Sequence, residues 1–171
     1  GQGQAIFLNL PQHKMLIDTG GSFDEARFSI GKNVIIPYLM RQGIAQLDQV
    51  ILTHLDQDHS GAFTEIKKVI KMNKVYSNET DARFNLHDFD YCQQGQYWQY
   101  EDVRISVLAP DKNSLSKAAY DRNELSCVIY IQVPQSKSYQ NFLLMGDAGW
   151  ETEFNLLRQY PDLKVDVLVL G

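Results

Sequence analysis

The chain alternates short apolar runs with polar turns, a pattern that predicts β-strands interspersed with a few helices. The helices are expected over about 33–42, 60–70 and 150–159, the first capped by Asn33 and stopped by Gly43. Sheets covered by helices fit this order, but periodicity alone does not distinguish a Rossmann-like sheet from a sandwich. The strands are expected at 5–10, 14–18, 50–53, 74–77, 96–100, 103–108, 127–133, 142–145 and 165–170.

Length and charge narrow the functional classes. A chain of 171 residues is expected to form a single domain, 1–171. Its net charge of -5 argues against a surface that holds polyanions by Lys and Arg alone. Bound divalent metals could nevertheless reverse the local sign at a carboxylate-rich site, so nucleic acid stays among the candidate ligands.

No stretch of the chain reaches the about 18 consecutive apolar residues that could span a bilayer. The chain contains two cysteines, Cys92 and Cys127. The cysteine spacing is typical of neither a zinc site nor a redox motif. The sequence therefore indicates neither a cysteine-based metal site nor a disulfide framework, and it leaves the redox compartment open.

Four residues of metal-ligand type, His54, Asp56, Asp58 and His59, follow the apolar strand 50–53 directly. In an extended segment, alternate side chains point the same way, so the first three could converge while a turn brings His59 to a second point. The alternative is a solvated polar loop, but that would have to accommodate all four ligand types together. We therefore predict two neighbouring metal positions here.

Three motifs resemble those of the metallo-β-lactamase superfamily. Residues 53–61 resemble its H-x-H-x-D-H signature, with Asp56 replacing the second His. The run Asp18-Thr19-Gly20-Gly21 resembles the upstream Asp motif, and Gly146-Asp147 resembles the bridging-carboxylate motif. The resemblance implies an α/β (α+β) fold, the metallo-β-lactamase αββα sandwich. Complete members continue past the position of Gly171, so the sandwich is expected to be truncated at its C-terminal side.

The segments 1–5, 35–39, 42–44 and 52–61 together resemble the C-terminal domain of ComEC-type competence proteins. That resemblance implies a soluble, extracytoplasmic domain of a larger inner-membrane protein, the rest of which forms a DNA-uptake channel. The implied partners are DNA, as a single-stranded substrate, and other competence proteins. The implied activity is that of a metal-dependent hydrolase, a DNase that degrades DNA during uptake.

The resemblance also implies the role of each ligand. His54 and Asp56 would hold one divalent metal, Asp58 and His59 the other, and Asp147 would bridge them. Asp58, His59 and Asp147 would thereby be the catalytic residues. Carboxylates at three of the five positions favour Mn²⁺ or Mg²⁺, while the imidazoles keep Zn²⁺ as a candidate.

Further polar residues could support the site. Asp18 would either orient a metal ligand by a hydrogen bond or cap the turn at Gly20-Gly21. Superfamily members usually supply another His between the main loop and the bridging Asp, where this chain has Asn123 and Ser126 instead. Asn123 could contact metal or phosphate, or merely end a strand.

Two other functions remain open at this point. The missing His favours a non-catalytic domain that guides DNA through the channel. A thioester or lactam hydrolase of the same fold is the second alternative, and the replacement of the second signature His by Asp56 counts against it.

Overall fold

The computed structural model describes residues 4–20, 22–23, 28–29, 31–55, 62–113 and 125–170. The chain divides into two compact units, Gly1–Tyr91 and Cys92–Gly171, each built around its own five-stranded sheet. The single domain expected over 1–171 stays a prediction.

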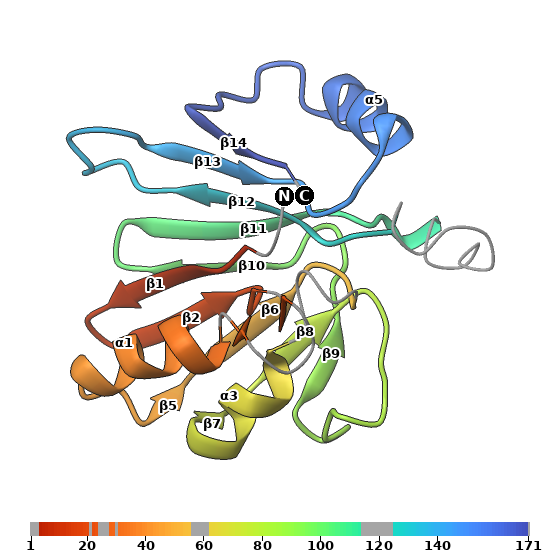
Figure 1. The fold of residues 1–171 in the computed structure, drawn as a ribbon. Helices are drawn as coiled ribbons and strands as arrows, with labels where there is room; N and C mark the ends of the chain where they lie inside the picture. The colour runs from red at the N-terminus through yellow and green to blue at the C-terminus, as the bar shows by residue number, and fades with distance from the viewer. Residues whose placement is uncertain are drawn as a thin grey trace. The chain divides into compact units, whose positions relative to one another are not determined.

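The sheet of the first unit has the strand order β1-β2-β6-β8-β9 (Figure 1). Its first two strands form an antiparallel hairpin, and β2, β6, β8 and β9 run parallel to one another. Parallel strands present their carboxyl ends at the same edge of a sheet, where ligands commonly bind in α/β folds. The strands are β1 (Ile6–Leu10), β2 (His13–Ile17), β6 (Gln49–Leu52), β8 (Val75–Ser77) and β9 (Phe89–Tyr91).

Two helices pack on one face of this sheet. Leu39 of α1 (Ile36–Arg41) and Phe63 of α3 (Phe63–Val69) join one buried cluster with side chains of β2, β6 and β8. Leu16, Val50 and Val75 lie opposite one another in the register, so they project to the same face. The helices thus fix β2, β6 and β8, whose carboxyl ends share one edge of the sheet. Two short strand pairs complete the described part of this unit: β3 (Ser22–Phe23) with β4 (Phe28–Ser29), and β5 (Gln46–Leu47) with β7 (Lys71–Met72).

The first helix begins differently from the sequence prediction. A π-helical turn, η1 (Gly31–Ile35), precedes α1, whose N-cap is Ile35 with no side-chain cap hydrogen bond. Asn33 therefore lies inside the helical segment and is not its cap, which corrects the prediction. The expected stop is present: Gly43 has a φ of 71°, which a residue without Cβ adopts readily, and its amide closes onto the Met40 carbonyl at 3.0 Å.

The sheet of the second unit has the order β10-β11-β12-β13-β14, antiparallel except for the last pair. The helix α5 (Trp150–Gln159) packs on one face through Leu156, against Leu143 and Met145. This packing fixes the end of the strand that leads to Asp147. The strands are β10 (Tyr97–Tyr100), β11 (Val103–Ala109), β12 (Val128–Gln132), β13 (Asn141–Leu144) and β14 (Val167–Val169).

Asp166 anchors the start of β13. Its carboxylate accepts hydrogen bonds from the backbone amides of Gln140 at 3.0 Å and Asn141 at 2.9 Å. These amide donors favour the charged form and hold the pKa of Asp166 below its usual range. The anchor adds a fixed contact between β13 and the chain entering β14.

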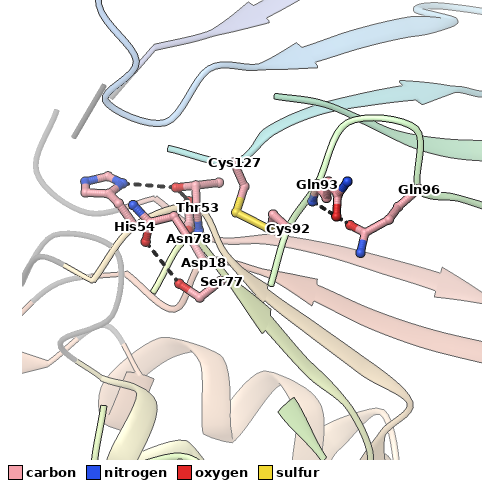
Figure 2. Close-up of a disulfide and its surroundings, with 9 residues drawn as sticks. All are labelled: Asp18, Thr53, His54, Ser77, Asn78, Cys92, Gln93, Gln96 and Cys127. Carbon is pink, nitrogen blue, oxygen red and sulfur yellow. Dashed lines mark hydrogen bonds between the residues drawn. A yellow bond between two sulfur atoms is a disulfide. The ribbon is translucent and has the colours of Figure 1, made fainter. Parts of the chain in front are cut away.

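Cys92 and Cys127 form a disulfide within the second unit, with a Cα–Cα distance of 5.8 Å (Figure 2). This corrects the expectation that the cysteines build no disulfide. The two residues are 35 positions apart, so their pairing depends on how the second sheet folds. Local spacing along the sequence carries no such information.

No helix in the described ranges is long and apolar enough to cross a membrane.

Candidate metal centre

Buried polar side chains of the first unit gather at the carboxyl edge of its parallel strands. Only His13 and Gln49, at or near the opposite ends of β2 and β6, depart from this pattern among its described residues. The residues at the carboxyl edge are Asp18 and Thr19 after β2, Thr53 and His54 after β6, and Ser77 and Asn78 at the end of β8. Burying polar groups is costly unless they are hydrogen-bonded, so this concentration marks a built site.

Asp18 ties the ends of β2 and β6 together. Its backbone amide donates to the Ile51 carbonyl at 2.7 Å. Its carboxylate accepts two hydrogen bonds from Thr53, from the backbone amide at 2.7 Å and from Oγ1 at 2.8 Å. Asp18 has a φ of 59°, a left-handed conformation that Asp tolerates better than most residues. The carboxylate is therefore held rigidly against Thr53.

Thr53 passes this restraint on to His54, because its Oγ1 lies 3.2 Å from Nδ1 of the imidazole (Figure 2). The hydroxyl carries a single proton, and it donates that proton to the Asp18 carboxylate. Oγ1 must therefore accept from His54, which places the imidazole proton on Nδ1. In a neutral imidazole this tautomer leaves the lone pair on Nε2.

This tautomer fits a divalent metal. Metal-ligating His residues usually donate their other ring N–H to an oxygen partner, which fixes the ring and raises its basicity. The successive hydrogen bonds from His54 to Thr53 and from Thr53 to Asp18 supply that support. His54 is also buried, with only 2% of its surface exposed. A ligand held in this way loses little rotational freedom when a metal binds. We call this chain of hydrogen bonds the His54 relay.

Three predicted metal ligands, Asp56, Asp58 and His59, lie outside the described residues, as does Asn123, which was predicted to support the site. Within the described ranges, no group of three or more His, Cys, Asp or Glu side chains could hold a metal ion. The two-metal arrangement predicted from the sequence therefore stays a prediction.

The second unit brings together two other predicted residues, Ser126 and Asp147. Ser126 is fully buried immediately before Cys127, and its Oγ accepts a hydrogen bond from the Asp147 backbone amide at 3.2 Å. Asp147 follows β13 after Gly146, which has a φ of 57°. Ser126 thus fixes the backbone of Asp147, the carboxylate predicted to bridge the metals.

Thr53, Ser77 and Asn78 are buried at the same edge, although the sequence pattern predicts no role for them. A signal was present, because polar residues stand at the ends of the strands expected at 50–53 and 74–77. Short stretches of the sequence do not reveal that β2, β6 and β8 are parallel neighbours. It is this pairing that places the strand ends side by side.

A sequence model of the metallo-β-lactamase superfamily matches residues 1–125. Three curated relatives match the whole chain. ComE operon protein 3 of Bacillus subtilis is 29% identical, Recombination protein 2 of Haemophilus influenzae 31%, and Competence protein ComA of Neisseria gonorrhoeae 27%. The chain spans 24%, 20% and 22% of their respective lengths. These relatives confirm the resemblance to competence proteins.

Solved metallo-β-lactamases share the fold. A HARLDQ-motif mutant of the enzyme from Cronobacter sakazakii is 14% identical, with a TM-score of 0.62 over 99% of this chain and 75% of its own. The subclass B3 enzyme MEM-A1, from a soil metagenome library, is 11% identical, with a TM-score of 0.64 over 99% and 73%. At such low identity the likeness concerns architecture only, and it confirms the predicted α/β fold class.

Proposed function

The chain belongs to the metallo-β-lactamase superfamily, and on this premise we propose that it is a metal-dependent nuclease domain that cleaves DNA phosphodiester bonds during DNA uptake. The observation that carries the proposal is the His54 relay, which holds a buried imidazole as the Nδ1–H tautomer, the form in which a His binds a metal through Nε2. A site that only guided DNA would need no such restraint on a single buried His.

The proposed ligands divide between two metals. His54 and Asp56 would hold one, Asp58 and His59 would hold the other, and Asp147 would contribute its carboxylate to both. When bound, a pair of divalent metals supplies water of lowered pKa and neutralises the charge of a phosphodiester. Among the described residues, Thr53 and Asp18 fix the ring of His54, and Ser126 fixes the backbone of Asp147. The carboxylate-rich set favours Mn²⁺ or Mg²⁺, with Zn²⁺ also accommodated.

DNA as the substrate is supported by two observations. Two of the relatives, at 31% and 27% identity, are named Recombination protein 2 and Competence protein ComA. The net charge of -5 means that this chain would attract phosphates through bound cations better than through its own side chains. The proposed partners are single-stranded DNA, other competence proteins, and the channel formed by the rest of a longer protein.

The disulfide supports the proposed extracytoplasmic location of this domain. Disulfides persist in oxidising compartments, such as the bacterial periplasm, and are rare where thiols are kept reduced. The Cys92–Cys127 bond is therefore expected in a domain that meets DNA outside the cytoplasm.

The test is cleavage of a fluorescent single-stranded oligonucleotide by the purified protein with Mn²⁺, Mg²⁺ or Zn²⁺. We expect metal-dependent cleavage that EDTA abolishes and that Asp58→Ala lowers by at least about 100-fold, since the substitution removes a metal ligand. Cleavage unchanged by Asp58→Ala would remove the nuclease assignment from this site. Binding of DNA without cleavage would favour the DNA-guiding alternative, and cleavage of a thioester or lactam alone would favour the other hydrolase.

A further inference from the structure

Asn78 lies at the same edge of the sheet as the candidate metal ligand His54, but it has no role among the proposed metal ligands. It directly follows β8, and only 6% of it is exposed. Leu52 of β6 pairs with Ser77 of β8 in a parallel register, so the next residues, Thr53 and Asn78, leave neighbouring strands at the same level. The sheet therefore places Asn78 next to Thr53, the middle residue of the His54 relay.

Ser77 fixes the orientation of that amide. The Ser77 hydroxyl, fully buried, donates to Asn78 Oδ1 at 3.3 Å. With its oxygen facing Ser77, the amide directs Nδ2 the other way, and Figure 2 draws this nitrogen on the side of the His54 imidazole. Nδ2 carries two N–H donors. The pair thus presents a hydrogen-bond donor of fixed direction at the edge where the candidate metal ligand stands.

The chemistry of this donor suits a phosphodiester better than a metal. Metals bind lone pairs, whereas the amide nitrogen of Asn78 offers only N–H donors, and the amide oxygen faces the Ser77 hydroxyl from which it accepts a hydrogen bond. A phosphate oxygen is a charged acceptor, and a hydrogen bond to a charged acceptor is stronger than one to a neutral acceptor. An amide donates without adding a charge that would repel the metals.

Resting on the proposed function, we infer that Asn78 is a substrate-binding residue whose Nδ2 donates to a nonbridging oxygen of the bound phosphodiester. Ser77 is its positioning residue. Because the contact is made to substrate and not to the metals, its loss should change DNA binding while leaving metal affinity intact. This separation distinguishes Asn78 from His54, whose loss should weaken metal binding.

The test compares Asn78→Ala and Asn78→Asp with the matched control Asn73→Ala. Asn73 precedes β8 at the opposite end of the strand, where its backbone amide donates to Leu47. Three quantities are measured: affinity for Mn²⁺, affinity for a fluorescent oligonucleotide in non-activating Ca²⁺, and KM and kcat for its cleavage in Mn²⁺. We expect Asn78→Ala to weaken oligonucleotide affinity about 10-fold or more, as for a lost hydrogen bond to a charged group, with Mn²⁺ affinity unchanged. Asn78→Asp should bind DNA still more weakly because its charge repels phosphate.

A second measurement uses only the wild-type protein, so its outcome does not depend on whether a variant folds. The side-chain NH₂ resonances of Asn78 in the ¹⁵N-labelled wild-type protein should shift when a phosphorothioate oligonucleotide is added in Ca²⁺. Unshifted resonances, or oligonucleotide affinity equal in Asn78→Ala and Asn73→Ala, would overturn the inference while wild-type cleavage upheld the nuclease proposal. A parallel loss of Mn²⁺ affinity would reassign Asn78 to metal binding. A wild-type protein that neither bound nor cleaved DNA would overturn both.

Discussion

Replacing His54 by Gln should lower metal-dependent DNA cleavage by more than about 100-fold, because loss of a ligand should exceed the about 10- to 100-fold effect of losing an outer partner. Gln keeps a polar side chain of similar reach but lacks the imidazole Nε2 lone pair. The Asp18–Thr53 hydrogen bonds would remain in place and would have no metal ligand left to orient. The measurement is kcat/KM in Mn²⁺, beside Mn²⁺ affinity by titration.

His13 offers a matched control for this substitution. It is also a buried His of the first unit, 8% exposed, with Nε2 3.1 Å from Gln49 Oε1. It begins β2, whereas Asp18 follows that strand, so the two residues are separated by about 16 Å of extended chain. His13→Gln therefore removes a buried imidazole at the other end of the same strand. Equal losses of activity in the two variants at equal thermal stability would contradict a specific role for His54.

Removing the disulfide by Cys92→Ala with Cys127→Ala should lower the free energy of unfolding by about 2–4 kcal/mol. The bond joins residues 35 positions apart, and cross-linking them removes chain entropy from the unfolded state. Both cysteines are fully buried, so alanine avoids placing a new polar group in the interior. Urea unfolding of the oxidised wild type and the double variant measures the difference.

Two comparisons make this prediction specific. Reduction of the wild type should reproduce most of the loss, while the same reductant should leave the double variant unchanged. Cys127 adjoins Ser126, which holds the Asp147 backbone, so activity should fall together with stability. Identical unfolding curves for oxidised wild type and double variant would show that the bond contributes nothing to the fold.

Much of the fold could be predicted because apolar periodicity and turn residues are local signals. The strands expected at 103–108 and 142–145 correspond closely to β11 and β13. β9 was missed because three residues, Phe89–Tyr91, give too short a pattern to separate from a loop. Asn33 was misplaced as a cap because a π-helical turn extends the helical segment ahead of α1.

The site could be predicted only as far as its motifs reach. Asp18 was selected from the turn that follows it, but its partner Thr53 depends on the parallel pairing of β2 with β6. The same limit hid Ser77 and Asn78, whose proximity to Thr53 depends on β6 pairing with β8. Long-range pairing also decides the disulfide. The roles of Asp56, Asp58, His59 and Asn123 stay predictions.

The central claim is that Asp18 and Thr53 hold His54 as the Nδ1–H tautomer, ready to bind a metal through Nε2. Long-range ¹H–¹⁵N spectra of the metal-free protein, with the His54 signals identified by their absence in His54→Gln, report which ring nitrogen carries the proton. We predict a protonated Nδ1 and an Nε2 resonance that shifts when Zn²⁺ is added. A proton on Nε2, or two nitrogen resonances that Zn²⁺ leaves unchanged, would contradict the claim.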